Sequence, residues 1–102
     1  MTASARVLGP MRPADGVFAR LFDDELLIID LSRGEYFALD PIGARLWSAI
    51  EDGQSVERLA HALTAEYHVA FEQALADLEA LVAELVARGL LVAVAGGKAD
   101  VR

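Results

Sequence analysis

The 102-residue sequence contains no cysteine, which excludes disulfide bonds, thiolate metal sites and cysteine nucleophiles together. It also lacks any apolar run near the roughly 18 residues that a membrane-spanning helix needs. Residues 1–15 contain scattered arginine and proline and no apolar segment of the kind found in a signal peptide. We therefore expect a cytoplasmic protein without a membrane partner.

Residues that build catalytic or metal sites are scarce as well. The two histidines, His61 and His68, do not form a pair at metal-ligand spacing. The acidic run Asp23-Asp24-Glu25 lies where a turn is expected, and carboxylates in such places are usually solvated. No glycine-rich phosphate loop follows a predicted strand, and no serine lies in a nucleophile motif. The sequence therefore predicts a protein that is not an enzyme and binds no cofactor or metal.

Acidic side chains are in excess, and the formal net charge is −7. Between Val17 and Val94 there are 14 acidic and 5 basic residues, a net charge of −9. Such a surface repels nucleic acid and anionic membranes and attracts basic partners. We expect no nucleic-acid partner.

Three apolar segments separated by turn residues predict a three-stranded antiparallel meander. They are Val17–Phe22, Leu26–Leu31 and Glu35–Leu39. Asp23-Asp24 separates the first two, and Ser32-Arg33-Gly34 separates the last two, with a glycine available for a positive φ. Both faces of the middle segment are largely apolar, so we expect it to be covered at least partly on both sides.

Three helices follow, each with a recognisable start or end. The first is expected over Pro41–Glu51, because Asp40 is a good N-cap and proline is favoured at the first helical position. The second begins after Ser55. The third runs over about Phe71–Arg88 and ends at Gly89.

These elements define an α+β domain of the winged helix-turn-helix class, in which a three-stranded antiparallel meander precedes three helices. We place the domain at residues 17–94, with Leu90–Val94 as a short terminal strand. Residues 1–16, which show no hydrophobic periodicity, and residues 95–102 are expected to be flexible.

The third predicted strand is an edge of the meander, and its ladder is free to pair with another strand. It contains neither proline nor lysine, two residues that commonly keep an edge from pairing. Glu35, Phe37 and Leu39 lie on one face, and Tyr36 and Ala38 lie on the other. We interpret this strand as a site that holds a peptide. The alternative, that a five-residue edge is too short to need blocking, stays open.

The third predicted helix has an apolar face wider than one packing surface requires. Leu75, Val82 and Val86 extend its core stripe to one side, so that the apolar face spans roughly 140°. Glu72 and Glu79 border the widened side. This face is either the wall of a groove or an ordinary part of the core under the sheet.

Two other functions compete with peptide binding. The winged-helix pattern is typical of DNA-binding regulators, but the helix that would enter the major groove has four acidic residues against Arg88 alone. A dimerisation or interaction module is the second alternative, and a homodimer that pairs through the third strand would also explain the bare edge.

The order of these residues resembles that of the PqqD-like proteins over about Val17 to Val92. A continuous run, residues 26–40, carries much of the resemblance. Shorter matches are Gly43, Leu46-Trp47, Asp52-Gly53, Ser55-Val56-Glu57, Tyr67-His68-Val69, Asp77 and Arg88-Gly89-Leu90-Leu91. Asp40 stands where the family usually has asparagine, and both residues cap helices. The chain lacks the Pro-Glu and Cys-Asp-Gly sequences of the pyrroloquinoline quinone pathway member and is more similar to the stand-alone recognition proteins of lasso-peptide clusters.

The resemblance implies a non-catalytic protein that recognises the leader region of a ribosomally made precursor peptide. It implies that the leader adds as an antiparallel strand to the third strand and packs against the third helix. It also implies delivery of the precursor to a separate leader peptidase and, through it, to a cyclase. The implied peptide-binding residues are Glu35, Tyr36, Phe37, Ala38, Leu39, Leu75, Leu78, Glu79 and Val82. On this interpretation, Val82→Asp is expected to abolish leader binding without unfolding the domain.

Overall fold

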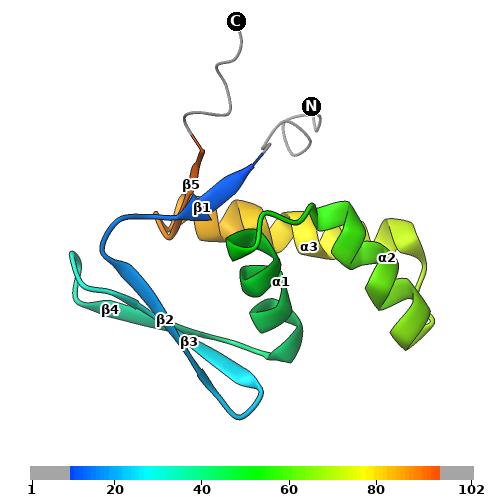
Figure 1. The fold of residues 1–102 in the computed structure, drawn as a ribbon, viewed down its shortest axis with the longest axis horizontal. Helices are drawn as coiled ribbons and strands as arrows, with labels where there is room; N and C mark the ends of the chain where they lie inside the picture. The colour runs from blue at the N-terminus through cyan, green and yellow to red at the C-terminus, as the bar shows by residue number, and fades with distance from the viewer. Residues whose placement is uncertain (1–9, 95–102) are drawn as a thin grey trace, which may run out of the picture.

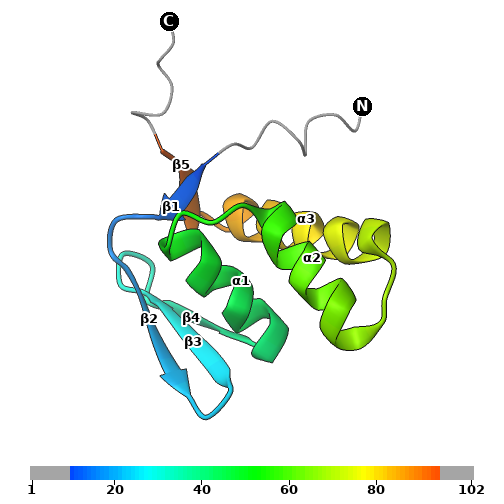
Figure 2. The same cartoon turned by 45° about the vertical axis from the view of Figure 1, so that its right-hand side comes forward.

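A computed structural model describes residues 10–94, in which three helices lie on one side of a small sheet (Figures 1 and 2). The strands are β1 (Met11–Pro13), β2 (Val17–Phe22), β3 (Glu25–Asp30), β4 (Glu35–Leu39) and β5 (Leu91–Ala93). The helices are α1 (Pro41–Glu51), α2 (Val56–Tyr67) and α3 (Phe71–Ala87). The expected α+β class, with a three-stranded meander before three helices, is confirmed. The predictions for residues 1–9 and 95–102 lie outside the described residues.

The main sheet is antiparallel and has the order β2-β3-β4, so that β3 is central and β2 and β4 are its edges. On the face that meets the helices, Ile28 is fully buried. On the outer face, Leu27 and Ile29 are half-buried, whereas Phe18 is 57% exposed and Tyr36 is 73% exposed. The expectation that β3 is covered on both faces is therefore met on one face and only in part on the other, because α1, the helix that packs on β3 and β4, lies on one side of the sheet.

The N-terminal segment contains a strand that the sequence did not predict. β1 pairs antiparallel with β5 in a second, two-stranded sheet. Two flanking backbone hydrogen bonds extend this pairing: Val94 N–H donates to the Pro10 carbonyl and Ala14 N–H donates to the Leu90 carbonyl, each at 3.0 Å. Residues 11–13 thus form a paired strand within the segment 1–16, which we expected from the sequence to be mostly disordered or loosely laid on the surface. They have no periodic pattern of their own, and their partner strand comes from the far end of the domain.

Local capping confirms where the first two helices begin. The Asp40 carboxylate accepts a hydrogen bond from Gly43 N–H at 2.8 Å, and the Ser55 hydroxyl oxygen accepts one from Arg58 N–H at 3.1 Å. α3 starts without a side-chain cap and ends one residue earlier than predicted, with Gly89 following at a φ of +78°. Together the helices and the sheet enclose one core. Its largest fully buried side chains are Trp47, Ile28, Leu46, Leu90, Leu91 and Val82.

Candidate functional site

The outer edge of β4 carries unpaired backbone groups. Within residues 10–94, β4 pairs only with β3. In an antiparallel sheet, the peptide groups of successive residues point to alternate sides of the strand. Leu31 N–H donates to the Gly16 carbonyl at 3.0 Å, so odd-numbered β3 residues bond to β2 and even-numbered ones bond to β4. On β4 this alternation leaves Tyr36 and Ala38 with their N–H and C=O groups directed outward.

The opposite edge of the sheet, on β2, is less open. Val17 N–H, the first outward donor of β2, already donates to the Ala14 carbonyl at 3.2 Å. In the described part of the chain no comparable backbone hydrogen bond engages Tyr36 or Ala38, and both residues are exposed. β4 is therefore the edge with the more accessible ladder.

The side chains of β4 divide between two surroundings. Phe37 and Leu39 are half-buried and pack against the core, whereas Tyr36 and Ala38 are exposed on the outer face. Tyr36 borders an open, largely apolar hollow on that outer face. The hollow is lined by Leu27, Ile29, Asp30, Leu31, Gly34, Glu35 and Tyr36. A strand added to β4 would extend both faces of the sheet.

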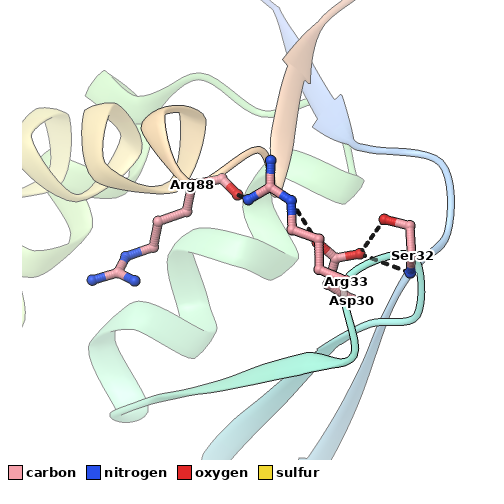
Figure 3. A network of polar contacts seen from close by, with 4 residues as sticks. All are labelled: Asp30, Ser32, Arg33 and Arg88. Atoms are coloured by element: carbon pink, nitrogen blue, oxygen red, sulfur yellow. Dashed lines mark hydrogen bonds and ion pairs between the residues drawn. The ribbon is translucent and has the colours of Figure 1, made fainter.

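The turn that precedes β4 is held by a buried carboxylate (Figure 3). Asp30 is 3% exposed and accepts hydrogen bonds from the Ser32 hydroxyl at 2.7 Å and from Ser32 N–H at 3.1 Å. Arg33 Nε lies 3.9 Å from the other carboxylate oxygen. The hydrogen bond from the Ser32 hydroxyl is the largest cause that lowers the pKa of the Asp30 carboxyl, against the opposing effect of burial. Asp30 therefore stays ionised and orders the turn from which β4 starts.

Replacing Ser32 with alanine should destabilise the domain at neutral pH and make its stability less sensitive to acid. A carboxyl whose pKa is lower in the folded chain than in the unfolded chain contributes stability above its unfolded pKa, and this is lost as the pH falls through its folded pKa. Wild type should therefore lose more stability than Ser32→Ala as the pH falls below about 4, the ordinary pKa of an aspartate. Urea unfolding at several pH values measures the difference. Equal acid sensitivity would show that the hydroxyl does not hold the carboxylate.

The same turn is tied to the end of α3. Arg33 Nη1 donates to the Arg88 carbonyl at 2.9 Å, although the two residues are 55 positions apart. The Arg88 guanidinium lies 4.7 Å from the centre of the Phe37 ring on β4. Its Nε and Nη2 donate to one carboxylate oxygen of Glu84 at 3.2 and 3.1 Å. β4 and the C-terminal end of α3 are therefore neighbours, and a strand added to β4 would lie beside Arg88.

The contact between Arg88 and β4 is made at the C-terminal end of α3, and helical spacing identifies the residues on the same side of the helix as Arg88. Residues four, seven and eleven positions before it lie on the same side of a helix, and these are Glu84, Leu81 and Asp77. Leu81 is half-buried and packs against the core, whereas Glu84 is exposed. We call these four residues the Arg88 side of α3.

Two of the predicted helix residues belong to the core. Leu78 is 2% exposed and Val82 is 1% exposed, so neither side chain is available at the surface of the domain. For these two residues the structure favours the alternative left open by the sequence, that the widened apolar face of the helix is ordinary core. It follows that Val82 is not a suitable position for testing peptide binding.

The other two predicted helix residues lie away from the Arg88 side of α3. At about 100° per residue, Glu79 lies about 180° around the helix from Arg88, and Leu75 lies about 140° from it. The structure thus keeps the predicted strand residues 35–39 together at the edge and places Arg88, which pairs with Glu84, beside Phe37. Arg88 and Glu84 were not predicted, although a glutamate four positions before an arginine is a recognisable helical ion pair.

Other ionisable contacts lie between the helices. Arg45 on α1 and Glu66 on α2 form a two-bond ion pair at 2.7 and 3.0 Å, which raises the pKa of Arg45 and lowers that of Glu66. His61 on α2 stacks on Phe71 of α3, with ring centres 4.3 Å apart. Within residues 10–94, no three acidic or histidine side chains gather to hold a metal ion, and no helix is long and apolar enough to cross a membrane. The two contacts link α1 to α2 and α2 to α3.

Comparison with known proteins gives matches that agree with one another. The family described as coenzyme PQQ synthesis protein D (PqqD) matches residues 25–91. The solved structure of TbiB1 in complex with the TbiA(beta) leader peptide is 35% identical, has a TM-score of 0.73, and covers 78% of this chain and 93% of that one. The structure of a lasso peptide synthetase B1 complexed with the leader peptide is 28% identical and has a TM-score of 0.78. The match covers 82% of this chain and 99% of that one. Curated protein sequences give no match.

Proposed function

The chain belongs to the PqqD family, and from this membership we propose that it recognises the leader region of a ribosomally made precursor peptide. The two solved structures that it resembles are both complexes with a leader peptide, and one of them is of a lasso peptide synthetase B1. By this likeness the precursor belongs to a lasso-peptide pathway. The protein itself acts as a binding partner and has no catalytic role.

The leader binds by adding a strand to β4. The observation that carries this proposal is the unpaired outer edge, where Tyr36 and Ala38 present two N–H and two C=O groups. Backbone hydrogen bonds to such an edge supply affinity, and the flanking side chains supply choice of sequence. In the antiparallel orientation, the N-terminal part of the bound segment lies beside Leu39 and its C-terminal part lies beside Glu35.

We extend the proposal to delivery of the bound precursor to a separate leader peptidase. Strand addition engages the peptide mainly through its backbone and leaves the rest of the precursor free for another enzyme. A peptidase encoded beside this protein should therefore cleave the precursor faster when the protein is present. That acceleration should disappear with a variant whose β4 edge is blocked. If this protein bound the leader but did not change the rate of cleavage, delivery would be wrong and leader recognition would still stand.

Binding should be visible at single amides of β4. We expect the synthetic leader of the precursor encoded beside this protein's gene to slow amide hydrogen exchange at Tyr36 and Ala38 by at least about tenfold, since both N–H groups gain an acceptor. NMR-detected exchange measures this, and Ala19, which points outward on the β2 edge, serves as the unaffected control. Exchange that slows with rising protein concentration and no leader would instead indicate a homodimer paired through β4. A leader that binds without protecting β4 would place the site elsewhere.

A further inference from the structure

We infer that Arg88 selects an acidic side chain at one position of the bound leader, the position opposite Phe37. This inference rests on the proposed binding of the leader to β4. It assigns a specificity-determining role to the C-cap residue of α3, which was not among the peptide-binding residues predicted from the sequence. The argument depends on the geometry of the edge, on the free donors of Arg88 and on the surrounding charge.

The hydrogen-bonding pattern of β4 determines which leader side chain reaches Arg88. Because Tyr36 and Ala38 point to the free edge, Phe37 would form a non-hydrogen-bonded pair with the leader, the kind in which opposing Cα atoms are only about 4.5 Å apart. Opposing residues project their side chains to the same face of the sheet. The leader side chain opposite Phe37 therefore projects to the core-facing side, where the Arg88 guanidinium lies 4.7 Å from the Phe37 ring centre.

Arg88 retains donors for a second carboxylate. Its Nε and Nη2 both donate to a single oxygen of Glu84, and the Arg88 side chain remains 46% exposed. A guanidinium carries five N–H donors, so the Nη1 group and one Nη2 hydrogen are left for a ligand. Half-exposed ion pairs of this kind contribute little stability, so Glu84 can share the guanidinium with a leader carboxylate or give it up.

The charges around the edge make this leader position more favourable for an acidic side chain than most other leader positions. Arg33 and Arg88 are two of only 5 basic residues between Val17 and Val94, and the Arg33 side chain contacts the Arg88 backbone carbonyl at the end of α3 (Figure 3). Elsewhere in that region acidic side chains predominate and repel an acidic leader residue. Since Glu84 and Asp30 offset the two arginines locally, selection depends on direct contact with Arg88.

A thermodynamic cycle between Arg88 and the leader tests this inference. The probe is the same synthetic leader, with each residue replaced in turn by glutamate, glutamine and lysine, and its affinity is measured by fluorescence anisotropy. At one position, wild type should prefer glutamate over glutamine by about tenfold, and Arg88→Gln should remove that preference. NMR contact between the Hα atoms of that leader residue and Phe37 identifies the position.

Two further variants act as controls. Arg58→Gln makes the same change of net charge at an exposed position on α2 and should keep the full preference. Arg88→Lys keeps the charge without the planar fork and should keep part of it. A glutamate preference that survives in Arg88→Gln would overturn the inference. So would tighter binding of every leader by Arg88→Gln, which would identify Arg88 as a side chain that the leader must displace. A wild-type protein that binds no leader would overturn the proposed function and, with it, this assignment.

Discussion

Ala38→Pro should weaken leader binding by at least about 100-fold in a domain that stays folded. The substitution removes one of the two outward donors of β4, and the proline ring occupies space that the leader backbone needs. Because the N–H of Ala38 faces away from β3, the ladder between the two strands is preserved, and proline is tolerated at such edge positions. Fluorescence anisotropy with labelled leader measures binding, and circular dichroism with urea unfolding checks the fold.

The chain offers matched controls for this experiment. Ala19→Pro makes the same change at an outward position of β2 and should bind the leader within about threefold of wild type. Phe37→Pro removes a donor that bonds to β3 and should destabilise the domain itself. Normal binding by Ala38→Pro, or equal loss in Ala19→Pro, would mean that the leader does not add to β4.

Val82→Asp should unfold the domain, in contrast to the expectation from sequence that it would only abolish leader binding. Val82 is 1% exposed and lies in the core. An unpaired carboxylate there loses its hydration and replaces apolar contacts, which together cost about 4–5 kcal/mol or more, close to the whole stability of a small domain. Urea and thermal unfolding should show no cooperative transition or a greatly lowered midpoint.

Two further substitutions separate the effect of a buried carboxylate from the effects of an added charge alone and of lost apolar contacts alone. Ala83→Asp places the same charge at an exposed position one residue further along α3 and should cost only about 1 kcal/mol, from lower helix propensity and a charge near the helix C-terminus. Val82→Ala removes only apolar contacts and should cost about 2 kcal/mol. If Val82→Asp folded normally and failed to bind the leader, Val82 would belong to the peptide-binding surface after all.

Most of the fold follows from signals between near neighbours in the chain. The Asp40 and Ser55 side chains bond to amides three residues later, so they could be recognised as helix starts from the sequence alone. The meander follows from alternating apolar segments and short turns, and its order makes β4 an edge without further information. For this reason the residues that β4 contributes to the candidate site, Glu35–Leu39, could be predicted from the sequence.

The residues of α3 and its C-terminal end that belong to the candidate site could not be predicted in the same way. A wide apolar face shows that a helix is buried over a large angle, but it does not identify the element that covers each part of that face. Two of the four helix residues chosen from the sequence, Leu78 and Val82, are covered by the domain's own core. Arg88 instead contacts Phe37 and Arg33. These residues lie about 50 positions before it in the sequence, so helical spacing could not reveal the contacts.

By itself, the sequence determined the three strands of the meander, the helices, the open edge and the resemblance to a peptide-recognition family, since each depends on spacing, capping or residue order. Only the tertiary structure decided which side of α3 lies beside that edge and that β1 pairs with β5. Both are contacts between distant parts of the chain, and their geometry arises from how all the elements pack together.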